Sequence, residues 1–160
     1  MPKTIKYCLD TSVYVNSWRK HYPIDIEHFK PIWDRIDELG QSKKVLSPEE
    51  VWVELKKKDD ELLAWAKTRR HLFCPPTESI QAAVKAVMAE HPRLVDTSRG
   101  RSIADPWVIA QAQVSSAIVV TEEELRTKTG KSPKIPDVCE AMGVPYMTTL
   151  EFIRRIFLNR

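Results

Sequence analysis

The chain has 160 residues, of which 42% are hydrophobic and 29% charged, and its formal net charge is +3. This composition predicts a single globular domain over residues 1–160, and the small net charge excludes a global electrostatic field as the basis of nucleic-acid binding. Scattered cysteines without a Cys-x-x-Cys pair argue against a zinc site or a disulfide framework. No apolar run approaches the ~20 residues that cross a bilayer, and the first residues lack the apolar core of a signal peptide, so we expect a cytoplasmic protein without membrane contact.

The first predicted element is a short, buried β-strand over residues 5–9. Asp10, Thr11 and Ser12 follow it at once. In an open α/β sheet, ligands bind outside the carboxyl ends of the strands, so Asp10 is a candidate functional carboxylate. The alternative is structural, because Asp10 or Thr11 could merely cap a helix that begins near Val13.

The middle of the sequence predicts helices separated by short connections. Residues 28–40 have the apolar spacing of a helix, and residues 44–46 predict a very short strand. Further helices are predicted over residues 62–71 and 77–91. The basic run over residues 67–71 suits a helix C-terminus, with a phosphate contact as the alternative.

The sequence Ser-Pro-Glu-Glu that begins at Ser47 predicts the start of another helix. Ser47 would be the N-cap residue, and Glu50 would close a capping box. Glu54 lies one turn further along the same helical face. It follows a mostly apolar stretch, so it could point into a partly buried groove. The alternative is an exposed acid that faces Lys57 or Lys58.

A further helix start is predicted at Asp105, after an exposed polar loop over residues 94–101. Asp105 suits the N-cap position, and Pro106 suits the first helical position. Capping does not exclude metal binding, because a carboxylate has two oxygens. Asp105 is therefore a candidate for both roles.

The clearest buried strand is predicted over residues 117–121, and it runs directly into three glutamates that begin at Glu122. Such a run is usually solvated surface, although here it stands at the carboxyl end of a strand. After a basic loop over residues 126–136, a helix, a short strand over residues 144–147 and a terminal helix complete the chain. This alternation predicts an α/β fold with a parallel sheet covered on both faces.

The acids at these positions could meet in one pocket, which Asp10, Glu54, Asp105 and either Glu122 or Glu123 would form. No His or Cys keeps metal-ligand spacing with them, and an all-oxygen site suits Mg²⁺ or Mn²⁺. Carboxylates packed together without a cation repel one another, so one or more would take up a proton. One or two divalent ions remove that penalty. They can also activate water and stabilise both oxygens of an in-line phosphodiester displacement.

Four short motifs occur in order along the chain: Leu9-Asp10-Thr11-Ser12, Val51-Trp52-Val53-Glu54-Leu55, Asp105-Pro106-Trp107-Val108-Ile109-Ala110-Gln111-Ala112 and Val119-Val120-Thr121-Glu122-Glu123. Together they resemble the PIN-domain nuclease family, and within it the bacterial and archaeal VapC-like toxins, over nearly the whole chain. The resemblance implies a three-layer α/β/α sandwich with a central, mainly parallel sheet. It also implies a cluster of acids that binds Mg²⁺ or Mn²⁺ and hydrolyses RNA.

The resemblance assigns roles to individual residues. Asp10, Glu54 and Asp105 match the first three acids of the family, and Thr121 matches the hydroxyl residue after the fourth strand. These four are the expected catalytic residues, and the three acids are expected metal ligands.

The fourth metal ligand is expected to be Glu123, although the family usually has Asp two places after the residue that Thr121 matches. The longer side chain of Glu moves the carboxylate by about one methylene, which matters in a metal site held to about 0.5 Å. Glu122 or Asp137 could substitute for it.

The resemblance implies a metal-dependent endoribonuclease, the toxin of a toxin–antitoxin pair, with an RNA substrate, a small antitoxin partner and a homodimeric assembly. Basic residues expected to meet the RNA backbone are Arg99, Arg101, Arg126, Lys128, Lys131 and Lys134. The alternative is a catalytically degenerate PIN-like module that binds RNA or protein without cutting, which the change to Glu123 favours. A phosphatase or receiver domain fits less well, because Ser12 stands where such phosphatases need a second Asp.

Overall fold

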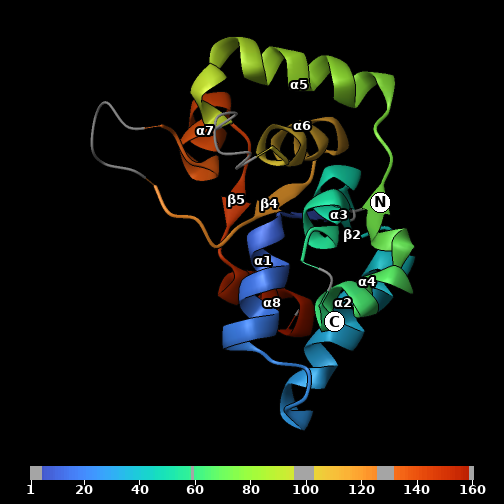
Figure 1. The fold of residues 1–160 in the computed structure, drawn as a ribbon. Coiled ribbons are helices and arrows are strands. Elements are labelled where there is room, and N and C mark those ends of the chain that lie inside the picture. The colour runs from blue at the N-terminus through green and yellow to red at the C-terminus, as the bar shows by residue number, and fades with distance from the viewer. Residues whose placement is uncertain (1–4, 59, 96–102, 126–131, 159–160) are drawn as a thin grey trace.

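The structure, a computed structural model, describes residues 5–58, 60–95, 103–125 and 132–158. Within these residues, five strands form one parallel sheet in the order β3-β2-β1-β4-β5 (Figure 1). The strands are β1 (Tyr7–Leu9), β2 (Val45–Pro48), β3 (Phe73–Cys74), β4 (Ile118–Val120) and β5 (Tyr146–Met147). The central strand, β1, is almost fully buried, as expected for a parallel strand with helices on both faces.

Helices follow the strands and cover both faces of the sheet (Figure 1). The α-helices are α1 (Thr11–Asn16), α2 (Lys30–Gln41), α3 (Glu49–Lys56), α4 (Glu61–Lys67), α5 (Glu78–Glu90), α6 (Asp105–Ser115), α7 (Ile135–Met142) and α8 (Thr149–Leu158). A π-helix, Ser17–His21, continues α1, and short 3₁₀-helices span Glu27–Phe29, Arg70–Leu72 and Pro92–Leu94. In the part of the chain that the structure describes, no helix has the length and apolar composition needed to cross a bilayer.

Two neighbouring residues of β1 show how the layers are arranged. Successive side chains of a strand point to opposite faces of the sheet. The ring of Tyr7 packs edge-on against Phe152 of α8, with 5.1 Å between the ring centroids. The thiol of Cys8 instead donates a hydrogen bond to Oε1 of the buried Gln111 in α6, at 3.1 Å. The sheet therefore lies between a layer that contains α6 and a layer that contains α8.

The predicted helix start at Ser47 is wrong. Ser47 is a fully buried residue of β2, and α3 begins at Glu49 with Pro48 as its N-cap residue. The Ser47 hydroxyl donates to the carbonyl oxygen of Leu9 at 2.7 Å and also bonds to the Tyr14 hydroxyl at 2.9 Å. An unpaired buried carbonyl at Leu9 would cost more free energy than the loss of a side-chain cap at the start of α3, so the Ser47 hydroxyl bonds to the carbonyl.

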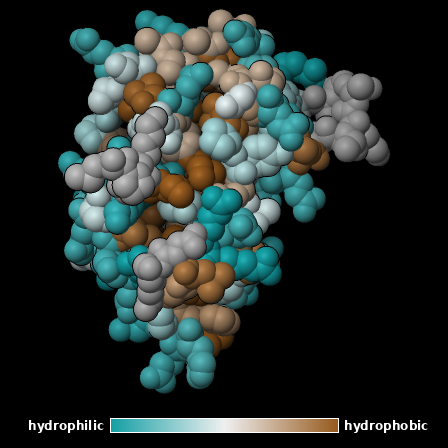
Figure 2. Space-filling view, turned by 180° about the vertical axis from the view of Figure 1, so that it is seen from behind, coloured by the Kyte–Doolittle hydropathy of each residue, from teal (hydrophilic) through white to brown (hydrophobic). Residues whose placement is uncertain are grey.

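The surface seen from behind has hydrophobic residues in separate groups among hydrophilic ones (Figure 2). Large exposed hydrophobic side chains come from several elements, as Val53 of α3, Val114 of α6 and Leu158 of α8 illustrate. The expected homodimer therefore stays a prediction without an assigned surface.

Candidate functional site

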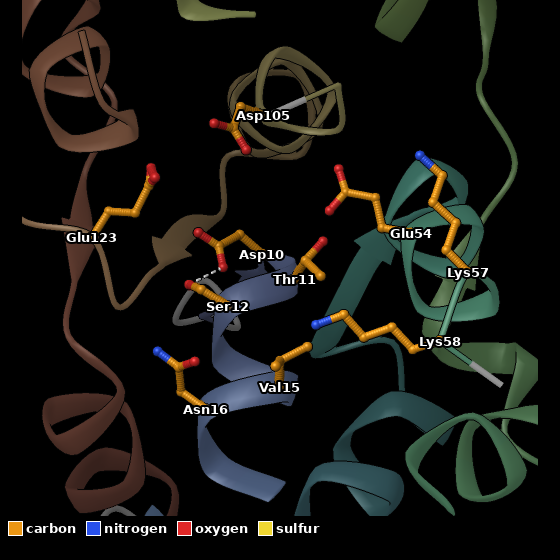
Figure 3. Close-up of a pocket in the computed structure, with 10 residues that line it drawn as sticks. All are labelled: Asp10, Thr11, Ser12, Val15, Asn16, Glu54, Lys57, Lys58, Asp105 and Glu123. Carbon is orange, nitrogen blue, oxygen red and sulfur yellow. Dashed lines mark hydrogen bonds between the residues drawn. The ribbon is translucent and has the colours of Figure 1, made fainter. Parts of the chain in front are cut away.

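An open cleft of about 380 Å³ lies at the carboxyl edge of the sheet. Figure 3 shows four carboxylates arranged around it, with Glu54 on one side, Glu123 on the other and Asp10 and Asp105 between them. The cleft is lined by Asp10, Thr11, Ser12, Val15, Asn16, Glu54, Lys57, Lys58, Asp105 and Glu123. Acids that lie far apart in the sequence thus share one space.

Asp10 caps α1 and also lines the cleft, so its two proposed roles coexist. Its Oδ1 accepts a hydrogen bond from the backbone N–H of Val13 at 3.3 Å. The Ser12 hydroxyl donates to the same oxygen, and the Thr121 hydroxyl donates to Oδ2 at 2.5 Å. These contacts fix the carboxyl group at the point where β1 ends.

Burial raises the pKa of Asp10 from 3.8 to about 6. Its residue is only 3% exposed, so the charged form loses much of its hydration. The hydrogen bonds from Ser12 and Thr121 oppose this effect because they favour the carboxylate, whereas the nearby Glu123 adds to it by charge repulsion. A cation in the cleft would favour the ionised form of Asp10.

Thr121 connects the loop after β4 to Asp10. The residue is 1% exposed, and besides donating to Asp10 its hydroxyl accepts from the backbone N–H of Glu123 at 3.0 Å. Ser12 makes a parallel link, since its hydroxyl accepts from the N–H of Glu122 at 3.1 Å. The two hydroxyls therefore orient both Asp10 and the backbone that carries Glu123.

Glu54 holds the start of α6 in place. Its Oε1 accepts a hydrogen bond from the backbone N–H of Ala104 at 3.0 Å. Ala104 is the N-cap residue of α6, and Asp105 is the first residue of the helix, so the prediction that Asp105 is the N-cap is wrong by one position. The backbone N–H of the N-cap residue is therefore paired with a side chain from another helix, α3. The N-cap side chain of α6 makes no capping hydrogen bond.

Three acids were candidates for the fourth position, and they have different surroundings. Glu123 lines the cleft, and its Oε1 also accepts from the N–H of Ile135, the first residue of α7, at 3.3 Å. Glu122 faces His21, with 3.5 Å between Oε1 and Nε2. Asp137 accepts from the N–H of Lys134 at 2.7 Å in the first turn of α7. Glu123 is therefore the one of the three that the cleft includes.

The donor set of the cleft fits a hard divalent cation in its chemistry. All four acids offer oxygen ligands, and Asp10 would be relieved of the cost of burying its charge. Among the described residues, however, no three His, Cys, Asp or Glu side chains lie close enough together to hold a metal ion. The acids therefore share a cleft, and their side chains would have to close in to coordinate one ion.

Five of the six residues that are predicted to contact RNA fall in two segments of the chain. Arg99, Arg101, Arg126, Lys128 and Lys131 lie outside the described residues. Lys134 is described, is half-buried at the start of α7 and is not among the residues that line the cleft.

The cleft contains two basic residues whose spacing in the sequence predicts only possible partners of Glu54. Lys57 and Lys58 follow the last turn of α3 and line the cleft. Their position three and four residues after Glu54 was the available signal, because such residues lie on one side of a helix.

A parallel sheet between two helical layers, with an acidic cleft at its carboxyl edge, defines a PIN-like α/β/α sandwich, and the predicted fold class is confirmed. At the level of sequence, the chain belongs to the family described as a domain of unknown function, DUF4411, whose pattern matches residues 7–159. No curated protein sequence matches it.

Comparison with solved structures gives the following matches. The crystal structure of VapBC2 from Rickettsia felis, bound to a DNA fragment from its promoter, matches with a TM-score of 0.57 and 12% sequence identity, over 90% of this chain and 98% of that chain. PAE2754 from Pyrobaculum aerophilum matches with a TM-score of 0.46 and 13% identity, over 95% and 96% of the two chains. At such identities the likeness to VapBC2 concerns the fold alone.

Proposed function

We propose that this protein is a metal-dependent endoribonuclease that uses Mg²⁺ or Mn²⁺ to hydrolyse phosphodiester bonds of RNA. The observation that carries the proposal is the meeting of Asp10, Glu54, Asp105 and Glu123 in one open cleft at the carboxyl edge of a PIN-like sheet. Ligands of such sheets bind at this edge.

The four carboxylates would hold the ion, which when bound would lower the pKa of a water nucleophile and offset charge at the phosphoryl group. The remaining roles belong to the chain itself. Thr121 and Ser12 orient the Asp10 carboxyl group through their hydroxyls. Glu54 fixes the start of α6 and thereby places Asp105 beside the cleft.

The biological role that we propose is the toxin of a toxin–antitoxin pair in the cytoplasm, acting as a homodimer and held inactive by a small antitoxin protein. Its support is the fold shared with VapBC2 from Rickettsia felis and the resemblance of the motifs to VapC-like toxins.

The proposal is tested by incubating the purified chain with a mixed RNA pool in Mn²⁺, in Mg²⁺ and in EDTA. Asp105→Asn should abolish cleavage, by at least about a hundredfold, with little loss of folding, because it removes one negative charge but keeps the size of a side chain in the first turn of α6. Circular dichroism of the variant checks the fold. Cleavage that persists in EDTA, or unchanged activity of the variant, would contradict the proposal.

A second candidate is a PIN-like module that binds RNA or protein without cutting. Two observations favour it: Glu123 stands where an Asp is usual, and no close metal-ligand cluster occurs within the described ranges. This candidate predicts RNA binding that needs no metal and weakens steeply with salt, and no cleavage under any of the three conditions.

A further inference from the structure

Two lysines form one wall of the cleft at the end of α3. The N–H groups of Lys57 and Lys58 donate to the carbonyl oxygens of Glu54 and Leu55, each at 3.3 Å. These bonds span three residues, as in a 3₁₀ turn that tightens the end of a helix. Both lysines line the cleft together with Glu54. In Figure 3, Lys57 extends alongside Glu54 and Lys58 extends toward α1.

An ion pair joins the start of α4 to the π-helix that continues α1. Asp60 begins α4 as its N-cap residue and accepts from the N–H of Leu63 at 3.2 Å. Its other oxygen pairs with Arg19 of the π-helix that continues α1, at 2.7 Å. The pair is partly exposed, so its energetic contribution is small. Lys58 lines the cleft together with Val15 and Asn16 of α1.

The charges of the cleft are unevenly distributed. Four carboxylates and two ammonium groups line it, so acids exceed bases by two. Both lysines are exposed, and among the described residues no carboxylate lies within ion-pair distance of either. The cleft thus combines an acidic centre that would repel a phosphodiester strand with one basic wall that would attract it.

We propose that Lys57 and Lys58 bind the phosphodiester backbone of the nucleic-acid substrate and so set the side of the cleft along which the strand enters. An ammonium group recognises phosphate as a point charge, so the contact carries no base preference. The inference rests on the proposed function and names the residues that would seat its substrate. Lys56 provides a matched comparison, because it is an exposed neighbour that does not line the cleft.

The test measures anisotropy of a labelled, unstructured RNA in EDTA over a series of salt concentrations. The full chain is compared with the double variant Lys57→Ala/Lys58→Ala and with Lys56→Ala. The double variant should bind about tenfold more weakly, and its slope of log affinity against log salt should fall by about 1.4, since each contact to single strands contributes about 0.7. Lys56→Ala should match the parent chain. DNA of the same sequence should show the same loss, because the phosphate is common to both.

Steady-state cleavage in Mn²⁺ gives an independent readout. The double variant should raise KM about tenfold with little change in kcat, as expected when binding is lost equally from the ground state and the transition state. A parent chain that cuts RNA while the double variant equals Lys56→Ala in KM and in salt slope would overturn the assignment of the lysines alone. A loss confined to RNA would overturn the phosphate contact in favour of a 2′-hydroxyl contact. A parent chain that neither binds nor cuts RNA would overturn the proposed function and this inference together.

Discussion

Burial destabilises the ionised form of Asp10, and hydrogen bonds from its neighbours offset part of that cost. The residue accepts from two hydroxyls and one backbone N–H, yet the pKa of its carboxyl group still lies at about 6. Hydrogen bonds therefore compensate only part of the desolvation. Such a carboxyl group fits a site that gains stability when a cation enters.

The metal-free protein should be less stable at neutral pH because of Asp10. A carboxyl group whose pKa is 3.8 in the unfolded chain and about 6 when folded binds its proton more tightly in the folded state. The protonated form is therefore favoured by folding, and the free energy of unfolding falls as the pH rises from about 4 to above 6. The whole difference corresponds to roughly 3 kcal/mol.

Asp10→Asn removes this titration. In EDTA, the free energy of unfolding of the variant minus that of the parent chain should rise by on the order of 1–3 kcal/mol from pH 4 to pH 7.5. Urea unfolding of both proteins at the two pH values measures this change. A stability difference that is the same at the two pH values would contradict the buried-charge account.

Thr121 offers a second test at this scale. Its hydrogen bond lowers the pKa of Asp10, so Thr121→Val should raise that pKa further and move the acid limb of the pH–activity profile to higher pH. Activity should fall about tenfold near pH 6.5 and less near pH 8.5. Thr121→Ser keeps the hydroxyl and serves as the control. A profile of the Val variant that superimposes on that of the Ser variant would exclude this role of the hydroxyl.

Among the elements, α3 and α6 depend on each other through the Glu54 side chain. Its Oε1 binds the N–H of Ala104, a residue that is 1% exposed, so loss of the acceptor would leave a buried donor unpaired. The same side chain is an expected metal ligand. Structural and chemical roles thus coincide, and they can be separated by substitution.

Glu54→Gln retains an oxygen that can accept from Ala104, whereas Glu54→Ala does not. We expect the Gln variant to keep its stability within about 0.5 kcal/mol and to lose RNA cleavage, and the Ala variant to lose about 1–2 kcal/mol as well. Thermal unfolding and cleavage of the RNA pool measure the two effects. Equal stability of both variants would show that the hydrogen bond does not hold α6.

For the whole molecule, the sequence predicts the fold class and the gathering of acids, because hydrophobic periodicity and strand ends are local signals. β1, β4 and the start of α1 follow from such signals. The strand β3, which has two residues, is too short to give one. The role of Ser47 was missed because its partners, Leu9 and Tyr14, are distant in the sequence.

In the cleft too, some features follow from the neighbouring sequence and others from contacts between elements that are far apart in the chain. Asp10, Glu54 and Asp105 were predicted from their positions beside predicted elements and from the resemblance of the motifs, and all three line the cleft. Glu123 was expected from the resemblance, and it lines the cleft whereas Glu122 does not. The shift of the α6 cap to Ala104 depends on a contact between α3 and α6, which no local pattern contains. Lys57 and Lys58 looked like ordinary surface charges until the ends of α1 and α3 were placed across one cleft.

The central claim is that the acids of the cleft form one divalent-cation site, and calorimetric titration of the metal-free chain with Mn²⁺ at neutral pH tests it most directly. We expect binding that Asp10→Asn and Asp105→Asn each weaken by at least about tenfold. Asp137→Asn, which alters an acid outside the lining of the cleft, should leave it unchanged. Absence of binding, or equal affinities in all four proteins, would contradict the account.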